Sequence, residues 1–452
     1  MKGILTLLAK IYARFLTLLA LINLPRFTGY LLRLSSFYIY HSVKKRRHNT
    51  RRVLILSKAV FTEDAISVLS KLNNIEVMSL RRSSIKAIAR AFLPSEVDDN
   101  NYFSASNASK EGMFKYRRFL IDMWPAFDPY SHIRMVITGN FGYFAERELG
   151  AALESIRVPF VVLHKENLKT PGRVVFSERI YAERRGPFLG RKILVYNQIE
   201  RDLMLRAGVI TPDRVEVVGM PRLDLIHDWR RASAGLKPQP VVLFFSFLPV
   251  TGMPLIYRKG GNRKAHYVEK NTDTSNGLHV SEFCKSVHRA VLQLAMDCPD
   301  ISVVIKTKGR DRDRNGLIEL LGINDAARLP SNISLVHDGS PFDLICKAAV
   351  VCGFNSTALL ESLAAGKTVV VPSYAECNNP TYIPLILDLG DAVTKATSPE
   401  MLMKILERLA RLREPLRSEL DYPVREVLKY WLGNDDGCAR ERSAAIFEST
   451  MQ

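Results

Sequence analysis

Short apolar runs alternate with amphipathic segments from residue 51 onward, and this alternation is typical of repeated βα units. In the first half the apolar runs are continuous, which favours parallel strands covered by helices on both faces. We expect strands at 51–58, 75–80, 134–140, 158–165, 192–197 and 214–219. Helices are expected near 62–72, 83–93, 113–123, 143–156 and 198–207, with polar or Gly/Pro-bearing loops at 94–112 and 166–191. The first half is therefore predicted to be a doubly wound parallel sheet.

The alternation stops at 233–240, where a glycine and two prolines indicate a linker, and then starts again. Strands are expected at 241–247, 301–307, 332–337, 350–353 and 367–372. Helices are expected at 281–297, 341–348, 355–365, 398–412 and 416–432, and residues 248–279 are expected to form a long loop. We predict two Rossmann-like domains that face a cleft, followed by C-terminal helices. Ligands in such sheets bind at the carboxyl ends of the strands.

The first 48 residues have a different pattern. Thr6, Lys10, Arg14 and Thr17 form one polar stripe of a helix that Pro25 is expected to end. The opposite face is apolar and consists of Ile4, Leu8, Ile11, Phe15, Leu18 and Ile22. No run of about 18 uncharged apolar residues is present, so a polytopic membrane protein is excluded.

Positive charge is concentrated in the same region. The formal net charge is +18, and residues 1–52 contain eleven Lys or Arg and no acid. An amphipathic helix beside such a cluster is typical of a monotopic segment on an anionic membrane surface. We therefore predict that residues 1–52 bind the cytoplasmic face of the inner membrane. A cleaved signal peptide, a tilted span and a helix packed on the protein body remain alternatives.

Six cysteines lie between residues 284 and 438 without zinc-type spacing, so we expect reduced thiols and no metal site.

We predict that the chain is divided into a membrane-associating segment, an acceptor domain, a nucleotide-donor domain and closing helices that pack back on the body. Their predicted ranges are 1–48, 49–235, 236–415 and 416–452.

A strand at 350–353 runs into a helix that begins at Asn355, Ser356 or Thr357. A helix N-terminus offers free N–H groups and partial positive charge, which suit a phosphate. Glu361, one turn further on, could accept hydrogen bonds from ribose hydroxyls. The same residues would also serve as a simple N-cap.

His164 follows another predicted strand, and histidine is the usual general base near neutral pH. Glu166 could orient it or act as the base, while Lys169 could hold an anion. A structural histidine is the alternative.

Two further strand ends carry charge. Arg222 and Asp224 follow the strand at 214–219 and could pair with each other, or Arg222 could bind a diphosphate. Lys306, Lys308 and Arg310 could bind an anionic ligand, although a solvated basic loop would have the same composition.

Together these motifs resemble GT-B glycosyltransferases of bacterial surface carbohydrate synthesis, and most closely the CDP-glycerol glycerophosphotransferase-like group. The resemblance covers roughly residues 50–445. It rests on the H-x4-K-x2-G spacing at His164, the G-x-P-R-x-D turn at Gly219, the Ser356-Thr357 helix start with Glu361, and a late Asp436-Gly437. One feature departs from the family: Lys308 stands where the family has a second histidine, which favours a sugar over glycerol phosphate as the transferred group.

The resemblance implies metal-independent transfer from a nucleotide-activated sugar to a lipid-linked or polysaccharide acceptor, without a cofactor. His164 would act as the base, with Glu166 as the competing candidate. Lys306, Lys308 and the helix start would hold the donor phosphates.

A glycerophosphotransferase, a nucleotide-sugar 2-epimerase and a non-catalytic carbohydrate-binding scaffold remain alternatives. A nucleic-acid partner is not expected, because the positive charge is clustered at one end and no aromatic-rich basic face accompanies it.

Overall fold

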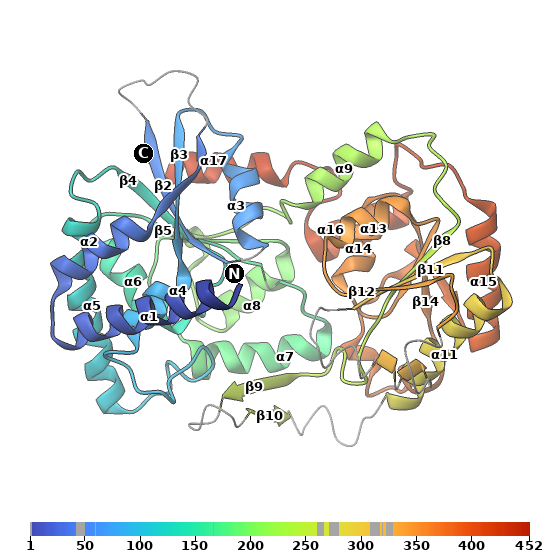
Figure 1. Ribbon diagram of the computed structural model, residues 1–452, viewed down its shortest axis with the longest axis horizontal. Helices are drawn as coiled ribbons and strands as arrows, with labels where there is room; N and C mark the ends of the chain where they lie inside the picture. Colours follow the sequence, from blue (N-terminus) through green and yellow to red (C-terminus); the bar gives the residue numbers. More distant parts are fainter. Residues whose placement is uncertain are drawn as a thin grey trace.

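The computed structural model describes residues 2–41, 50–58, 60–165, 167–259, 266–270, 280–307, 317–318, 320–321 and 329–452. The described chain forms two α/β units that lie side by side, each built around its own sheet (Figure 1). The prediction of two Rossmann-like halves is confirmed.

The first sheet has seven strands in the order β1-β3-β2-β4-β5-β6-β7. All neighbours pair in parallel except β1, which is antiparallel to β3 at the sheet edge. The strands are β1 (Phe37–His41), β2 (Arg51–Ser57), β3 (Ile75–Arg81), β4 (Ile133–Thr138), β5 (Phe160–Leu163), β6 (Lys192–Val195) and β7 (Val215–Val217). The apolar side chains of its central strands are buried, as their apolar sequences predict.

The helices of this half agree with the predicted pattern except at three places, one of which is the segment Leu223–Ala232, where no helix was expected. They are α3 (Phe61–Leu69), α4 (Arg82–Ala89), α5 (Asn107–Phe127), α6 (Phe144–Ser155), α7 (Pro171–Ile180), α8 (Gln198–Arg206) and α9 (Leu223–Ala232). The helix α5 begins inside the expected loop because the Ser106 side chain caps it by accepting from Ser109 N. The helix α7 was missed because Gly172 and Pro171 suggested a loop, although Pro171 occupies its first turn, where proline is favoured. A short π-helical turn (Tyr181–Arg185) and a 3₁₀ turn (Pro212–Arg214) complete this half.

The second sheet is entirely parallel, with the order β12-β11-β8-β13-β14-β15. Its strands are β8 (Val241–Phe245), β11 (Ser302–Lys306), β12 (Ile333–Val336), β13 (Val350–Gly353), β14 (Thr368–Pro372) and the unexpected β15 (Thr394–Ala396). The helices are α11 (Ser281–Asp297), α13 (Pro341–Lys347), α14 (Thr357–Ala364), α15 (Pro399–Leu412) and α16 (Tyr422–Leu432). The 3₁₀ turns lie at Ala375–Asn378, Ile383–Leu385 and Gly390–Ala392.

Two predictions for this half are wrong in detail. The segment expected as one long loop contains an antiparallel hairpin of β9 (Leu255–Lys259) and β10 (His266–Lys270). The helix α16 starts at Tyr422 rather than 416, because Asp421 and Pro423 provide a helix start there.

The chain passes between the two units twice, once near Gly219 and once near Gly433. These two connecting segments contact each other. A Cβ on Gly219 would collide with the Gly433 carbonyl oxygen, and one on Gly433 would collide with that of Tyr196. Both glycines also have positive φ, so the close contact and the backbone conformation each favour glycine at these positions. After the second crossing, α17 (Ala439–Thr450) packs on the first unit, where Phe447 joins the core beside Phe61 (Figure 1).

The N-terminal segment is built into the first unit. The helix α1 (Lys2–Leu21) packs on α4, and α2 (Pro25–Ser35) packs on α5. Leu16 and Leu32 are fully buried in the core cluster that also contains Leu54 of the sheet. Pro25 begins α2 rather than merely ending the first helix, since proline fits the first turn of a helix.

The packing of α1 leaves its apolar stripe outside. Leu8, Ile11, Phe15, Leu18 and Ile22 are 43–56% exposed, while Thr17 of the polar stripe turns inward and donates a hydrogen bond to the Ala87 carbonyl (2.9 Å). Among the described residues, no helix is both long enough and apolar enough to cross a membrane.

Candidate functional site

A fully buried ionic cluster lies at the carboxyl end of β5. His164, the residue after this strand, has its Nε2 3.2 Å from Glu200 Oε1, and Lys169 Nζ is 3.5 Å from Glu200 Oε2. Tyr181 donates a hydrogen bond to Glu200 Oε1 (2.7 Å). Both His164 and Glu200 have no exposed surface.

Glu200 is charged in this setting. Burial alone would raise its pKa, but Lys169, His164 and Tyr181 outweigh burial and lower the pKa of Glu200 to about 2. Neither ring nitrogen of His164 has a hydrogen-bond partner among the described residues, although Nε2 lies within ion-pair distance of Glu200. A buried polar atom without a partner is uncommon in a folded protein and needs an explanation.

The loop after His164 is tied to the sheet by Asn167. Its side-chain oxygen accepts from Tyr196 N (3.0 Å), and its amide donates to the His164 carbonyl (2.5 Å). At the end of the loop, α7 begins against the second unit. A Cβ on Gly172 would lie 2.7 Å from a methyl carbon of Leu385, so a larger residue would require that side chain to shift.

On the second unit, Ser356 is the N-cap of α14, and its hydroxyl accepts from Ala358 N (3.3 Å). Asn355 has a left-handed backbone (φ 50°). Its amide donates to the Leu385 carbonyl (2.9 Å) and its oxygen accepts from Leu387 N (3.0 Å). The predicted helix start is thus present, and the Asn355 side chain fixes the neighbouring segment.

A small cavity of about 60 Å³ lies at the carboxyl ends of β8, β11 and β13. Its lining combines apolar residues with hydroxyl and amide groups. The lining residues are Ser246, Phe247, Leu248, Thr251, Thr307, Leu317, Leu320, Phe354, Asn355 and Ser356. At its edge His288 Nε2 lies 2.9 Å from the Ser246 hydroxyl, and burial lowers the pKa of His288 to about 4, so this histidine is neutral.

The His164 cluster of the first unit and the start of α14 on the second unit are connected through the segment that contains Leu385. Leu385 touches the position of Gly172 on the first unit and receives a hydrogen bond from Asn355 on the second. The H-x4-K-x2-G stretch and the Asn355-Ser356-Thr357 helix start therefore face the same junction between the units.

Arg222 bridges the two units at a second point. Its guanidinium lies 3.2 Å from Asp64 Oδ2 on α3 and 3.8 Å from Glu361 Oε1 on α14. Burial raises the pKa of Asp64 to about 6, although Arg222 opposes the shift, and burial also raises the pKa of Glu361.

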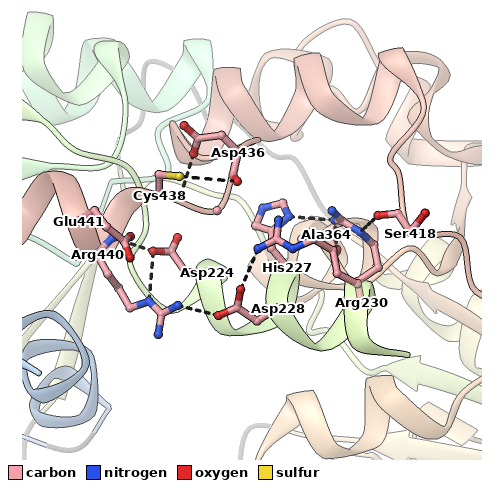
Figure 2. A network of polar contacts seen from close by, with 12 residues as sticks. Asp224, His227, Asp228, Arg230, Ala364, Ser418, Asp436, Cys438, Arg440 and Glu441 are labelled. Carbon is pink, nitrogen blue, oxygen red and sulfur yellow. Dashed lines mark hydrogen bonds and ion pairs between the residues drawn. The ribbon is translucent and has the colours of Figure 1, made fainter. Parts of the chain in front are cut away.

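Arg222 and Asp224 do not pair with each other, contrary to one of the two interpretations of their spacing. Asp224 instead joins the crossover to α17 (Figure 2). It accepts hydrogen bonds from the backbone N–H groups of Ala439 (3.1 Å) and Arg440 (2.7 Å), from the Arg440 side chain (3.2 Å) and from the Asn434 amide (2.6 Å). Both carboxylate oxygens are thus used at the start of α17. Asp436, the acid of the late Asp-Gly, pairs with Arg442 (2.7 Å).

Lys306 lies at the end of β11, but its ammonium group points to backbone. It donates to the carbonyls of Thr307 (2.9 Å) and His337 (2.6 Å), and burial lowers its pKa. Glu166, Lys308 and Arg310 lie outside the described residues. Within the described ranges, no group of three His, Cys, Asp or Glu side chains could hold a metal ion.

Sequence reasoning did not single out Glu200 or Asp64. A signal for Glu200 was available: Asn197 ends a predicted strand and Glu200 follows three residues later, as in a capping motif. The Asn197 side chain does accept from Glu200 N (2.9 Å). Asp64 carries no such local signal, because only the tertiary fold brings it to Arg222.

No protein-family model matches the chain, and no curated protein sequence does either. Several solved structures align over nearly its whole length. The UDP-GlcNAc 2-epimerase from Neisseria meningitidis bound to UDP-GlcNAc is 14% identical, with 88% of this chain and all of that chain aligned, at a TM-score of 0.45.

The wall teichoic acid polymerase TagF is 10% identical over 97% of both chains, at a TM-score of 0.47. A UDP-forming α,α-trehalose-phosphate synthase from Burkholderia vietnamiensis is 12% identical over 89% of this chain and 98% of that chain, at 0.45. These similarities are too loose to assign an activity.

Proposed function

We propose that this protein is a GT-B-like glycosyltransferase that moves a sugar from a nucleotide-activated donor to a lipid-linked or polysaccharide acceptor. The observation that carries the proposal is the unpartnered, fully buried His164 beside a charged Glu200, on the side of the junction opposite the start of α14. Within it, residues 49–235 bind the acceptor, 236–415 bind the donor, and 416–452 close the structure.

His164 acts as the general base. Glu200 lies beside Nε2 and favours the tautomer that carries its proton there, so Nδ1 keeps a lone pair that can take the proton of an acceptor hydroxyl. Glu200 then stabilises the imidazolium that forms. Because His164 has no exposed surface, this role requires that acceptor binding opens a path to Nδ1.

The donor is held by the second unit. The free N–H groups at the start of α14, with the hydroxyl of Thr357, face the leaving diphosphate. These fixed dipoles stabilise negative charge as the donor bond breaks, so no metal is required. Lys308 and Arg310 are the remaining candidates to bind the donor phosphates. Glu166 competes with His164 as the base.

The acceptor is presented at a membrane. The exposed apolar stripe of α1 and the basic residues of the first 52 positions support a location at the cytoplasmic face of the inner membrane, without a span.

The test is release of nucleotide from UDP-, GDP-, CDP- and CMP-activated donors by the purified full chain, read by chromatography. We expect slow hydrolysis of one donor, lost in His164→Ala and kept in His132→Ala, which alters an exposed histidine before β4. Equal release by His164→Ala would move the base to Glu166. Isomerised donor without release would establish the 2-epimerase alternative. No release and no binding of any donor would indicate a scaffold.

A further inference from the structure

A second cavity, of about 300 Å³, lies at the carboxyl ends of β2 and β3, on the same edge of the first sheet as His164. All six lining residues carry a cationic or hydroxyl side chain, and none is acidic. They are Ser57, Lys58, Arg81, Arg82, Ser83 and Lys86.

Two of the four cations, Lys58 and Arg82, are held in place by the fold. Lys58 donates to the Tyr143 hydroxyl (2.9 Å), and the Arg82 guanidinium stacks 3.3 Å from the centre of the same ring. Arg82 also pairs with the buried Glu146 of α6. Arg81 is exposed at the rim and forms no ion pair with any described residue. The cavity therefore keeps a positive excess, and paired guanidinium, ammonium and hydroxyl donors suit phosphate oxygens.

The cavity borders α4, which packs against the inner face of α1, opposite the exposed apolar stripe. Ala87, the neighbour of Lys86 on α4, accepts the hydrogen bond from Thr17 of α1, so the two helices pack directly on each other. Packed helices lie about 8–10 Å apart. With the stripe of α1 at the acyl boundary of a membrane, the cavity lies about one helix spacing above it, at the depth of the lipid head groups.

We propose that this cavity binds the phosphate group of the lipid-linked acceptor. The inference rests on the proposed function and adds its substrate class: an acceptor whose phosphate is fixed in the first unit while its hydroxyl approaches His164. A free phosphate ion offers the same oxygens, but the exposed apolar stripe on the outer side of α1 favours a lipid source.

The test measures binding of the full chain, without donor, to phosphatidylcholine vesicles that contain phosphatidic acid, a lipid phosphate monoester. Vesicles with phosphatidylglycerol, adjusted to the same surface potential, are the reference. Arg81→Gln removes a charge from the cavity, and Arg14→Gln removes one from the outside of α1. Ser83→Ala removes a hydroxyl and leaves the charge unchanged.

We expect Arg81→Gln to lower the preference for phosphatidic acid about fivefold, which corresponds to about 1 kcal/mol. Ser83→Ala should lower it in the same direction. Arg14→Gln should weaken binding to both lipids alike and leave the preference unchanged. Thermal unfolding confirms that each variant is folded.

Equal loss for both lipids in Arg81→Gln would overturn the proposal, since the cavity would then contribute only general charge. Inorganic phosphate that binds as tightly as the lipid would overturn the lipid source. Because no donor is present in this assay, a wild-type chain that shows no preference for phosphatidic acid but still hydrolyses a donor rejects the cavity alone. The reverse result rejects the transferase alone.

Discussion

The carboxyl edges of the two sheets use their polar side chains in different ways. On the first sheet, His164 Nδ1 lacks a partner, Glu200 is a buried anion, and Arg81 is exposed at a basic cavity. On the second sheet, Lys306 and Asn355 are bound to backbone groups. The residues predicted from the sequence at the carboxyl edge of the second sheet therefore mostly have a structural role there.

In the proposed transferase, this difference corresponds to a division of work between the two units. The first unit contributes buried ionisable side chains, whereas the second offers fixed dipoles and a shaped cavity. Helix N–H groups can bind a phosphate without a charged side chain, so the second unit needs only a correctly placed helix start.

The largest expected effect comes from Glu200→Gln. It leaves Lys169 buried without its carboxylate partner, and breaking a buried ion pair in this way costs about 3–5 kcal/mol. Urea unfolding measures the loss. Glu407→Gln breaks an exposed pair with Arg411 and should change stability by less than about 1 kcal/mol. Similar small losses for both variants would mean that the cluster is not a buried ion pair in solution.

The next effect is a pair of opposite pH dependences. The pKa of Glu200 is lowered to about 2, so its contribution of about 3 kcal/mol is complete above pH 4.5 and is lost as the pH falls toward 2. The pKa of Asp64 is raised to about 6, so the folded state binds this proton more tightly and stability declines by up to about 3 kcal/mol between pH 3.8 and 6.

Unfolding curves over pH 2–7 test both signs. Glu200→Gln should remove the acid loss below pH 4.5, and Asp64→Asn should remove the decline between pH 3.8 and 6. A decline that persists in Asp64→Asn would assign it to another group, such as Glu361, whose pKa is also raised.

A smaller effect is expected on the second sheet from Asn355→Ala. The variant loses two hydrogen bonds to 385–387 and places alanine in a left-handed backbone, at a cost of about 2 kcal/mol. Asn355→Gly relieves the backbone strain and should be less destabilised. Equal stability of the two variants would show that backbone strain adds nothing there.

The smallest effect is expected from Lys306→Met, because the ammonium group bonds only backbone carbonyls and is partly desolvated. We expect a loss of about 1 kcal/mol in stability and a donor KM within about twofold of wild type, a factor worth well under 1.4 kcal/mol. A tenfold rise in the donor KM with unchanged stability would indicate that Lys306 binds the donor phosphates after all.

Much of the fold could be predicted from the sequence, because buried parallel strands are continuous apolar runs whose signal is local. The hairpin of β9 and β10 and the helix α7 were missed, since polar and Gly/Pro-rich segments match a loop equally well. The apolar stripe of α1 was identified, but the pattern alone did not show that its other face packs on α4.

The site was predicted less completely, for a physical reason. The motifs located strand ends, and the structure does bring His164 and Lys169 together. Their common partner Glu200 lies on a later helix, and the partner of Arg222 lies on α3, more than 150 residues earlier. Spacing along the chain cannot choose among acids that only the fold brings close, so Asp224 was as good a candidate partner as Asp64.

The most direct test of the account is the pH profile of donor hydrolysis by wild type and His164→Ala, with the donor that releases nucleotide. We predict that His164→Ala abolishes the wild-type activity at every pH measured while unfolding at a similar temperature. Full activity in a folded His164→Ala, with the same pH profile, would contradict the central claim that this buried histidine is the base.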